Sequence, residues 1–515
     1  MSGGKGKLEM NIVERIKYHA GVQPLALAMI SDDEEISYQE LDMASDYLAA
    51  YLDAVCGNDF STIPVYGHKS VYMLICMLAC VKSGRAYCPI DVSTPDSRTQ
   101  VILKELESPV VLATEVLQYD SKKVINKDEI KGIIRKQQNK NVPDRWIKGD
   151  QVFYIIFTSG STGKPKGVQI TANCLNSYLD WSVELGNAKE GKIGTVFLNQ
   201  APFSFDLSVM DLYTCLACGG TLWALSKAVQ SDYKLLMQSL NTSNTSIWVS
   251  TPSFAEICLS DKQFNERLLP RLKVFLFCGE TLTNDTADKL TERFPQAVIV
   301  NTYGPTESTV AVTSVKIGRE WIERANPLPL GKAKAGTRIE IRDENGQKVE
   351  DGQKGEIVIV GNTVSIGYYK SLDLTQKSFF TEDRNGEQVR GYRTGDQGYI
   401  EDGLLYYCGR IDLQVKLHGY RMEMEDIENN LMKLNDIDRA VVLPNMKDGK
   451  AKSLSAYVVY KGELKERFEA ALELKKQLKE FLPDYMIPKK FIFLEEFPVN
   501  NNGKIDRKLL GGLSK

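Results

Sequence analysis

Residues able to bind an anion gather in one short run, Thr158-Ser-Gly-Ser-Thr-Gly-Lys-Pro-Lys-Gly167, directly behind an apolar stretch. The run holds four hydroxyls, three glycines and two lysines. Glycine permits positive φ and a close approach of backbone N–H groups to an anion, while the other side chains add donors and positive charge. Because Pro165, and not Ser or Thr, follows Lys164, the run is not a Walker A loop. The pattern predicts a phosphate loop for a nucleotide triphosphate, with an ordinary Gly/Ser surface turn as the alternative.

Four further polar motifs follow in the second half of the chain. They are Asn301-Thr-Tyr-Gly-Pro-Thr-Glu307, Tyr392-Arg-Thr-Gly-Asp396, Gly409-Arg-Ile-Asp412 and Asn502-Gly-Lys-Ile-Asp-Arg507. The first comes behind an apolar run, and ligands of open α/β sheets bind beyond the carboxyl ends of the strands. Asp396, behind a glycine, suits a pair of ribose hydroxyls. Each motif alone is also consistent with a surface turn or solvated charges, and their joint occurrence favours a nucleotide site.

The pattern between residues 11 and 330 predicts a rigid frame for these motifs. Helical patterns alternate there with short, apolar, β-branched runs. Such runs cover residues 62–66, 110–113, 152–157, 195–198, 246–249, 274–277 and 297–301. Strands that alternate with helices favour parallel sheets covered by helices on both faces.

The pattern changes twice after Pro329. Residues 338–343 and 356–360, separated by Asp, Asn and Gly, indicate antiparallel strands of a small barrel or distorted sheet. From about residue 413 the sequence predicts a separate α+β domain. Its expected helices cover residues 424–434 and 464–481, and its expected strands cover residues 439–443 and 454–460.

Composition excludes several classes of protein. The 515 residues carry a net charge of −3, so no basic field exists to hold nucleic acid. No apolar signal segment opens the chain, and the apolar run at residues 71–81 is too short to cross a bilayer. The ten cysteines lack a regular spacing and suit reduced core thiols, and Cys215 and Cys218 form a CxxC without further metal ligands. We therefore expect a cytoplasmic protein without membrane insertion.

The chain resembles the adenylate-forming superfamily, which includes acyl-CoA synthetases, luciferases and the adenylation domains of peptide synthetases. The five motifs carry this resemblance together with Ile36-Ser-Tyr-Gln-Glu-Leu41 and Gly84-Arg-Ala-Tyr-Cys-Pro-Ile-Asp91. The similarity covers nearly the whole chain, and such a set of motifs is very specific.

The resemblance implies an α/β fold. Its N-terminal core, residues 1–410, would contain two αβ subdomains within about residues 1–330 and a small β-barrel within about residues 331–410. A mobile α+β lid domain, residues 411–515, would swing about a hinge near Asp412.

The resemblance also implies how ATP and Mg²⁺ are held. Lys504 would be the catalytic lysine that bridges the substrate carboxylate, the α-phosphate and the ribose. Glu307 would bind Mg²⁺, and Asp396 and Arg410 would take the ribose hydroxyls. The implied ATP-binding residues are Thr158, Ser159, Ser161, Thr162, Lys166, Gly279, Glu280, Asn301, Thr302, Tyr303, Gly304, Pro305, Thr306, Asp396, Tyr407, Arg410 and Lys504.

Asp206 separates amino-acid activators from activators of fatty or aryl acids in this superfamily. An aspartate at this position pairs with the substrate ammonium, and a zwitterion that enters a dry pocket needs such a counter-ion. The alternative for Asp206 is a helix N-cap ahead of residues 207–216.

Within the superfamily the sequence is most similar to ligases that activate D-alanine and load it onto a carrier protein for teichoic-acid D-alanylation. In those ligases the cysteine matching Cys278 lies against the substrate α-carbon and favours the D form, and the residue matching Val310 lines the pocket. The expected substrates are D-alanine and the phosphopantetheine thiol of a carrier protein, and the expected enzyme is a monomer. Simple packing at the end of a strand is the alternative for Cys278.

Three other functions stay open from the sequence alone. An acyl- or aryl-CoA synthetase would share the five motifs, but Asp206 would then be an unpaired charge beside an aliphatic tail. An enzyme for L-alanine or glycine would need only a different pocket shape. A non-catalytic scaffold would not need Lys504, Glu307 and the phosphate loop, which are all intact.

Overall fold

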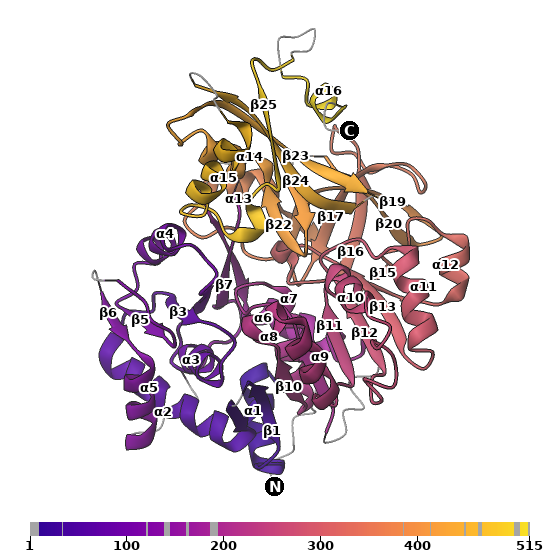
Figure 1. Ribbon diagram of the computed structural model, residues 1–515. Coiled ribbons are helices and arrows are strands. Elements are labelled where there is room, and N and C mark those ends of the chain that lie inside the picture. Colours follow the sequence, from indigo (N-terminus) through magenta and orange to yellow (C-terminus); the bar gives the residue numbers. More distant parts are fainter. Residues whose placement is uncertain are drawn as a thin grey trace. The chain divides into compact units, whose positions relative to one another are not determined.

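The computed structural model describes most of the chain in two compact units (Figure 1). The described residues are 10–32, 34–119, 122–137, 145–160, 164–185, 194–384, 386–411, 414–447, 450–461, 466–498 and 505–512. The larger unit comprises Met1–Val92, Glu105–Ile156 and Gly167–Gly409, and the smaller unit comprises Ser93–Lys104, Phe157–Lys166 and Arg410–Lys515.

A nine-stranded sheet carries most of the predicted site. Its strand order is β15-β14-β13-β12-β11-β9-β10-β1-β2, and its six central strands from β13 to β1 are parallel to one another. In chain order the strands are β1 Leu27–Ser31, β2 Glu34–Ser37, β9 Val196–Asn199, β10 Thr221–Ala224, β11 Ile247–Ser250, β12 Val274–Phe277, β13 Val298–Tyr303, β14 Thr313–Ile317 and β15 Lys332–Ala333. Strands β2, β14 and β15 pair in the antiparallel sense at the edges. The prediction of parallel sheets is therefore confirmed.

A second sheet has the order β6-β5-β3-β4-β7-β8. Its strands are β3 Ile63–Gly67, β4 Tyr87–Asp91, β5 Val110–Ala113, β6 Lys123–Ile125, β7 Val152–Thr158 and β8 Lys166–Thr171. Strands β3 to β7 pair in parallel. Strand β7 leads directly into the predicted phosphate loop, as the apolar run ahead of that loop indicated.

Helices pack on these sheets and begin at clear sequence signals. They are α1 Ile12–Val22, α2 Tyr38–Cys56, α3 Val71–Lys82, α4 Asp96–Leu106, α5 Lys127–Lys136, α6 Ala172–Ser182, α7 Leu207–Cys218, α8 Lys227–Ser231, α9 Tyr233–Thr242, α10 Pro252–Leu259, α11 Asn284–Arg293, α12 Arg319–Arg324 and α13 Leu372–Ser378. Capping boxes start α1, α2 and α5. Among the described helices, none combines the length and the apolarity needed to cross a bilayer.

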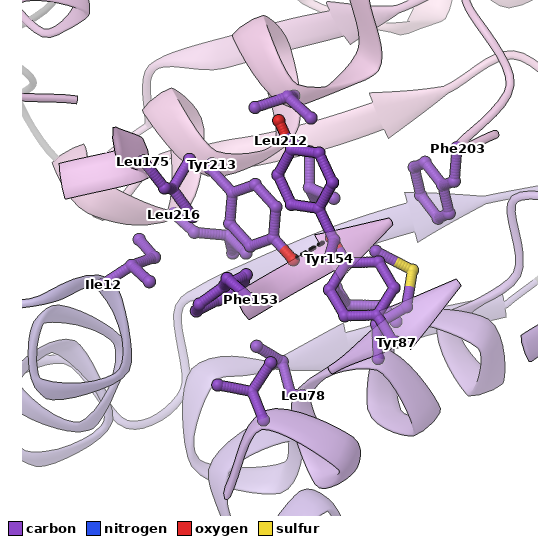
Figure 2. Close-up of a cluster of buried hydrophobic side chains, with 14 of the residues drawn as sticks. Ile12, Leu78, Tyr87, Phe153, Tyr154, Leu175, Phe203, Leu212, Tyr213 and Leu216 are labelled. Atoms are coloured by element: carbon purple, nitrogen blue, oxygen red, sulfur yellow. Dashed lines mark hydrogen bonds between the residues drawn. The ribbon is translucent and has the colours of Figure 1, made fainter. Parts of the chain in front are cut away.

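The largest apolar core joins both sheets. Side chains of α1, α3, β4, β7, α6 and α7 meet in it, as Figure 2 shows. The run at residues 71–81, which the sequence excluded as a membrane span, is the buried helix α3. Cys215 is buried in this core and Cys218 packs against it, both with free thiols, so the CxxC belongs to helix packing.

A five-stranded antiparallel sheet follows in the larger unit. It contains β16 Thr337–Arg342, β17 Gly355–Gly361, β18 Phe379–Arg384, β19 Glu387–Glu401 and β20 Leu404–Arg410. The register shifts between Glu356 and Val358 where β17 pairs with β19, which marks a bulge. The antiparallel character expected after residue 329 is confirmed.

The smaller unit has an α+β core of its own. It contains the hairpin β21 Gln414–Leu417 and β22 Tyr420–Glu423, the sheet β23 Ile437–Lys447, β24 Lys450–Tyr460 and β25 Lys490–Leu494, and the helices α14 Met424–Leu431, α15 Arg467–Leu478 and α16 Arg507–Gly512. Strand β25 is parallel to β24, while β23 is antiparallel to it. The α+β character expected from about residue 413 is thus confirmed.

Candidate active site

Two neighbouring strand ends of the nine-stranded sheet carry predicted site residues. Strands β12 and β13 run in parallel, with Phe277 opposite Asn301. The carboxyl end of β12 therefore places Cys278, Gly279 and Glu280 beside the start of the motif Asn301–Glu307. This is the edge where open α/β sheets bind ligands.

A strained turn holds the predicted substrate-pocket residue Val310. Thr309 and Val310 have φ values of 61° and 68°, which β-branched residues rarely adopt. The N–H of Ala311 donates to the carbonyl of Thr309 at 2.8 Å, so Val310 occupies the centre of a γ-turn with positive φ. Such strain persists only where surrounding structure imposes it, and it concentrates at functional sites.

The Cys278 thiol contacts this strained turn. Its Sγ atom donates to the carbonyl oxygen of Val310 at 3.6 Å, and both side chains are buried. Gly304 allows the backbone after β13 to lie close to this turn, because a Cβ at Gly304 would lie 2.6 Å from the Cα of Ala311. Two residues assigned to the pocket from the sequence are therefore in direct contact.

Asp206 is the residue immediately before α7, but it does not act as a side-chain cap. Its φ and ψ are −63° and −23°, and its side chain makes no capping hydrogen bond. A capping aspartate instead takes an extended conformation and accepts from the second or third helical N–H. The half-buried carboxylate is thus not engaged in the N-cap role that the sequence left open.

The loop between β9 and Asp206 is held by buried polar contacts that the sequence reasoning missed. Lys69 Nζ donates to the carbonyl of Gln200 at 2.8 Å, and Asn199 Nδ2 donates to Asp211 Oδ1 at 2.9 Å. Burial lowers the pKa of Lys69 to about 7, an effect that the Asp211 carboxylate opposes. These contacts fix the first part of the loop that ends at Asp206.

The predicted nucleotide residues lie along β13 and β19. Tyr303 donates its hydroxyl to Asp396 Oδ2 at 2.6 Å, and burial followed by the Asp396 charge raises the pKa of Tyr303. Asn301 donates through Nδ2 to the carbonyl of Pro329 at 2.8 Å, while its Oδ1 is buried without a partner among the described atoms. A buried amide oxygen of this kind fits an amino group such as that of adenine.

Glu307 lies fully buried in the short 3₁₀ segment Thr306–Ser308. Tyr368 donates its hydroxyl to Glu307 Oε1 at 2.8 Å, which orients the carboxylate. No group of three His, Cys, Asp or Glu side chains suited to a metal ion occurs within the described ranges. Any Mg²⁺ ion at Glu307 would therefore need oxygens from phosphate and water, which Mg²⁺ accepts readily.

The described part of the phosphate loop belongs to the smaller unit. Lys166 Nζ pairs with Glu423 Oε1 at 3.1 Å, and Ser159 donates its hydroxyl to the carbonyl of Arg421 at 3.0 Å. Thr158 donates to the carbonyl of Lys166 at 3.5 Å. A phosphate that binds Lys166 would therefore compete with the carboxylate of Glu423 for the ammonium group.

Several predicted residues fall elsewhere. Arg410 is the last residue of β20, and Tyr407 lies in the same strand. Ser161, Thr162, Asp412 and Lys504 lie outside the described residues.

Comparison with known families agrees with these motifs. Residues 16–369 match the model of the AMP-binding enzyme family, and residues 426–504 match the model of the AMP-binding enzyme C-terminal domain. The chain belongs to the AMP-binding enzyme family. The resemblance drawn from the sequence is confirmed.

Curated relatives of this AMP-binding enzyme cover nearly its whole length. A D-alanine–D-alanyl carrier protein ligase of Bacillus cereus strain Q1 is 48% identical over 506 residues, which is 97% of this chain and 99% of the relative. A ligase of the same name from Bacillus anthracis strain CDC 684 / NRRL 3495 is 47% identical over 505 residues, again 97% of this chain and 99% of the relative.

Solved structures confirm the fold with large N-terminal and small C-terminal domains. A Vibrio cholerae adenylation domain, solved with glycyl-adenosine-5'-phosphate, has a TM-score of 0.82 at 21% identity and covers 100% of this chain and 98% of its own. The o-succinylbenzoate CoA synthetase of Bacillus subtilis has a TM-score of 0.80 at 21% identity and covers 96% and 98%. An aminoacyl-adenylate enzyme and a CoA synthetase fit equally well, so the fold alone does not choose the substrate.

Two tyrosines of the AMP-binding enzyme escaped the sequence reasoning. Tyr154 and Tyr178 are fully buried near Asp206, yet Tyr154 lies in the apolar run of β7 and Tyr178 lies among polar and apolar residues of α6. No sequence motif marks them, because only the fold determines whether a buried hydroxyl has a hydrogen-bond partner.

Proposed function

We propose that this enzyme activates D-alanine with ATP and then transfers it to the phosphopantetheine thiol of a carrier protein, as its curated relatives' names describe. The observation that carries the proposal is the 48% identity, over 97% of this chain, to a D-alanine–D-alanyl carrier protein ligase, and an aspartate outside the N-cap role at position 206 agrees with it. Asp206 and Cys278 both act on the pKa of Tyr178, so they border one buried region. That region suits a small zwitterion, and it is unsuited to an aliphatic tail.

In the first half-reaction a carboxylate oxygen of D-alanine attacks the α-phosphorus of ATP, and pyrophosphate leaves with the electrons of the broken P–O bond. The protein contributes position and charge. Lys504 neutralises the charge that develops between the carboxylate and the α-phosphate. Thr158, Ser159, Ser161, Thr162 and Lys166 hold the β- and γ-phosphates.

The remaining nucleotide contacts come from the motifs that the sequence singled out. Asp396 and Arg410 take the ribose hydroxyls, and Glu307 helps to bind the Mg²⁺ that screens the phosphate charge. Adenine lies against the remaining residues, among which Asn301 offers its buried Oδ1. The others are Gly279, Glu280, Thr302, Tyr303, Gly304, Pro305, Thr306 and Tyr407.

In the second half-reaction the phosphopantetheine sulfur attacks the carbonyl carbon of the adenylate, and AMP leaves. We place the hinge that admits this thiol at Asp412, since a C-terminal lid that brings Lys504 to the site must move away for the thiol to enter. The loaded carrier would supply D-alanine for teichoic acid. All ten cysteines are free thiols, which suits the reducing cytoplasm, and we take the enzyme to be a monomer.

Pyrophosphate exchange tests the choice of substrate. Exchange would be measured separately with D-alanine, L-alanine, glycine and butyrate as the acid. We expect the highest kcat/KM with D-alanine and the lowest with butyrate. A higher kcat/KM with glycine or L-alanine would favour another small amino acid, and a higher kcat/KM with butyrate would favour an acyl-CoA synthetase.

Replacing Cys278 with alanine tests stereochemical discrimination. The thiol is held by the carbonyl of Val310, so it can meet the methyl group of one enantiomer. Contact with one methyl group typically discriminates about 10- to 200-fold. We expect the ratio of kcat/KM for D- over L-alanine to fall from this range to within about threefold of unity, while the KM for ATP stays constant. An unchanged ratio would mean that Cys278 only packs the strand end.

A further inference from the structure

Two fully buried tyrosines keep their hydroxyls without a hydrogen-bond partner. Tyr154 in β7 and Tyr178 in α6 are both 0% exposed, and neither hydroxyl has a partner among the described atoms. Most buried polar groups in native proteins are hydrogen-bonded, because an unsatisfied hydroxyl destabilises the fold. Two such hydroxyls in one region indicate a binding site whose ligand supplies the missing hydrogen bonds.

Both tyrosines face α7, the helix that Asp206 precedes. Tyr178 lies one helical turn before Ser182 and so shares its face of α6. The Ser182 hydroxyl bonds to that of Thr214 in α7 at 2.7 Å, which turns this face toward α7. Tyr154 reaches the same helix from β7, and Figure 2 shows it beside Tyr213 of α7.

Electrostatics gives a second sign of this proximity. Burial raises the pKa of Tyr154, and the Asp206 carboxylate is the next largest cause. Burial also raises the pKa of Tyr178, followed by the effects of Cys278 and then Asp206. Tyr178 therefore lies close to two of the three residues assigned to the amino-acid pocket.

A third tyrosine in the same cluster provides a contrast. Tyr213 is equally buried, but its hydroxyl shares a 2.6 Å hydrogen bond with that of Tyr87 (Figure 2). The two unpartnered hydroxyls are those of the tyrosines that Asp206 acts on.

We propose that Tyr154 and Tyr178 are positioning residues whose hydroxyls bond, through ordered water, to the ion pair between Asp206 and the substrate ammonium. This inference rests on the proposed function. A charge pair in a buried site is stable only if further hydrogen bonds satisfy its remaining donors and acceptors. The two hydroxyls supply such bonds when the amino acid is present.

Phenylalanine substitutions test the proposal, since they remove only the hydroxyl. We expect Tyr154→Phe and Tyr178→Phe each to raise the KM for D-alanine about tenfold, as for loss of a hydrogen bond to a charged group. The kcat and the KM for ATP should stay within about twofold. The melting temperature of the ligand-free protein should be equal or higher, because an unsatisfied hydroxyl is removed.

Tyr213→Phe is the matched control. It removes a satisfied hydroxyl from the same cluster, so it should lower the melting temperature and leave the KM for D-alanine unchanged. All four proteins would be compared by pyrophosphate exchange with D-alanine and by thermal unfolding without ligand.

The outcomes separate this inference from the proposed function. If both phenylalanine variants keep the KM for D-alanine within about twofold of wild type, or raise the KM for ATP equally, the tyrosines only pack the core. If wild type prefers another small amino acid, the choice of D-alanine is wrong and the same comparison applies to that amino acid. If wild type activates only acids without an amine, both proposals fail.

Discussion

Replacing Lys504 with alanine is expected to reduce D-alanine-dependent pyrophosphate exchange by about 10²- to 10³-fold, which corresponds to about 2.7–4 kcal/mol. The reason is that the attack of a carboxylate on the α-phosphorus concentrates negative charge, and a preorganised cation stabilises that charge most in the transition state. The KM for D-alanine should change much less than kcat. The second half-reaction, measured as transfer from preformed D-alanyl adenylate to a carrier thiol, should stay within about threefold of wild type.

Lys479→Ala provides a control of equal charge change. Lys479 is exposed and pairs only at the surface with Asp484, so its loss should leave both half-reactions intact. If Lys504→Ala abolishes thiol transfer together with adenylate formation, then Lys504 supports the fold and the two-state use of the C-terminal domain is wrong.

The buried strands were predictable from the sequence because their surroundings are uniform. Strands β5 and β12 match the expected residues 110–113 and 274–277 at both ends. A strand of a parallel sheet is covered on both faces, so it appears as a continuous apolar run between polar loops. The helix expected at residues 464–481 is shorter, Arg467–Leu478 among the described residues, because the charged pattern continues beyond the ends of the helix toward Gly462 and Pro483.

The motif around Asp396 shows where local patterns fail. Its glycine and charges are consistent with a solvated turn, yet it lies inside the fifteen-residue strand β19. Gly395 has a φ of 69°, and Asp396 is buried against the hydroxyl of Tyr303. Partners ninety residues apart along the chain determine this environment, and a short sequence window cannot contain them.

The candidate site also has one part that sequence motifs indicate and another part that they do not. The motif that starts at Asn301 is expected behind a strand, but β13 extends to Tyr303, so Asn301 lies inside the strand and Glu307 follows its end. The support beneath the site was not predictable. Tyr154 lies in an apolar strand, while Lys69 and Tyr178 lie in segments of mixed composition without a motif, and only the fold brings the three residues near the loop of Asp206.

Asp206 is the residue whose replacement should best distinguish an amino-acid substrate from a simple aliphatic acid. Asp206→Asn keeps the shape of the side chain and removes its charge. Loss of one partner of a buried ion pair typically costs about 3–5 kcal/mol, so we expect kcat/KM for D-alanine to fall by about 10²- to 10⁴-fold. Exchange with butyrate should rise relative to wild type, because the variant no longer places a carboxylate charge beside the aliphatic chain.

Thermal unfolding of the ligand-free protein separates this role from helix capping. Loss of a capping side chain typically costs about 0.5–2 kcal/mol. Because the Asp206 side chain makes no capping bond, the melting temperature of Asp206→Asn should stay unchanged while D-alanine activation collapses. A lower melting temperature with normal D-alanine kinetics would contradict the pocket assignment, since Asp206 would then stabilise α7 and the ammonium would need another partner.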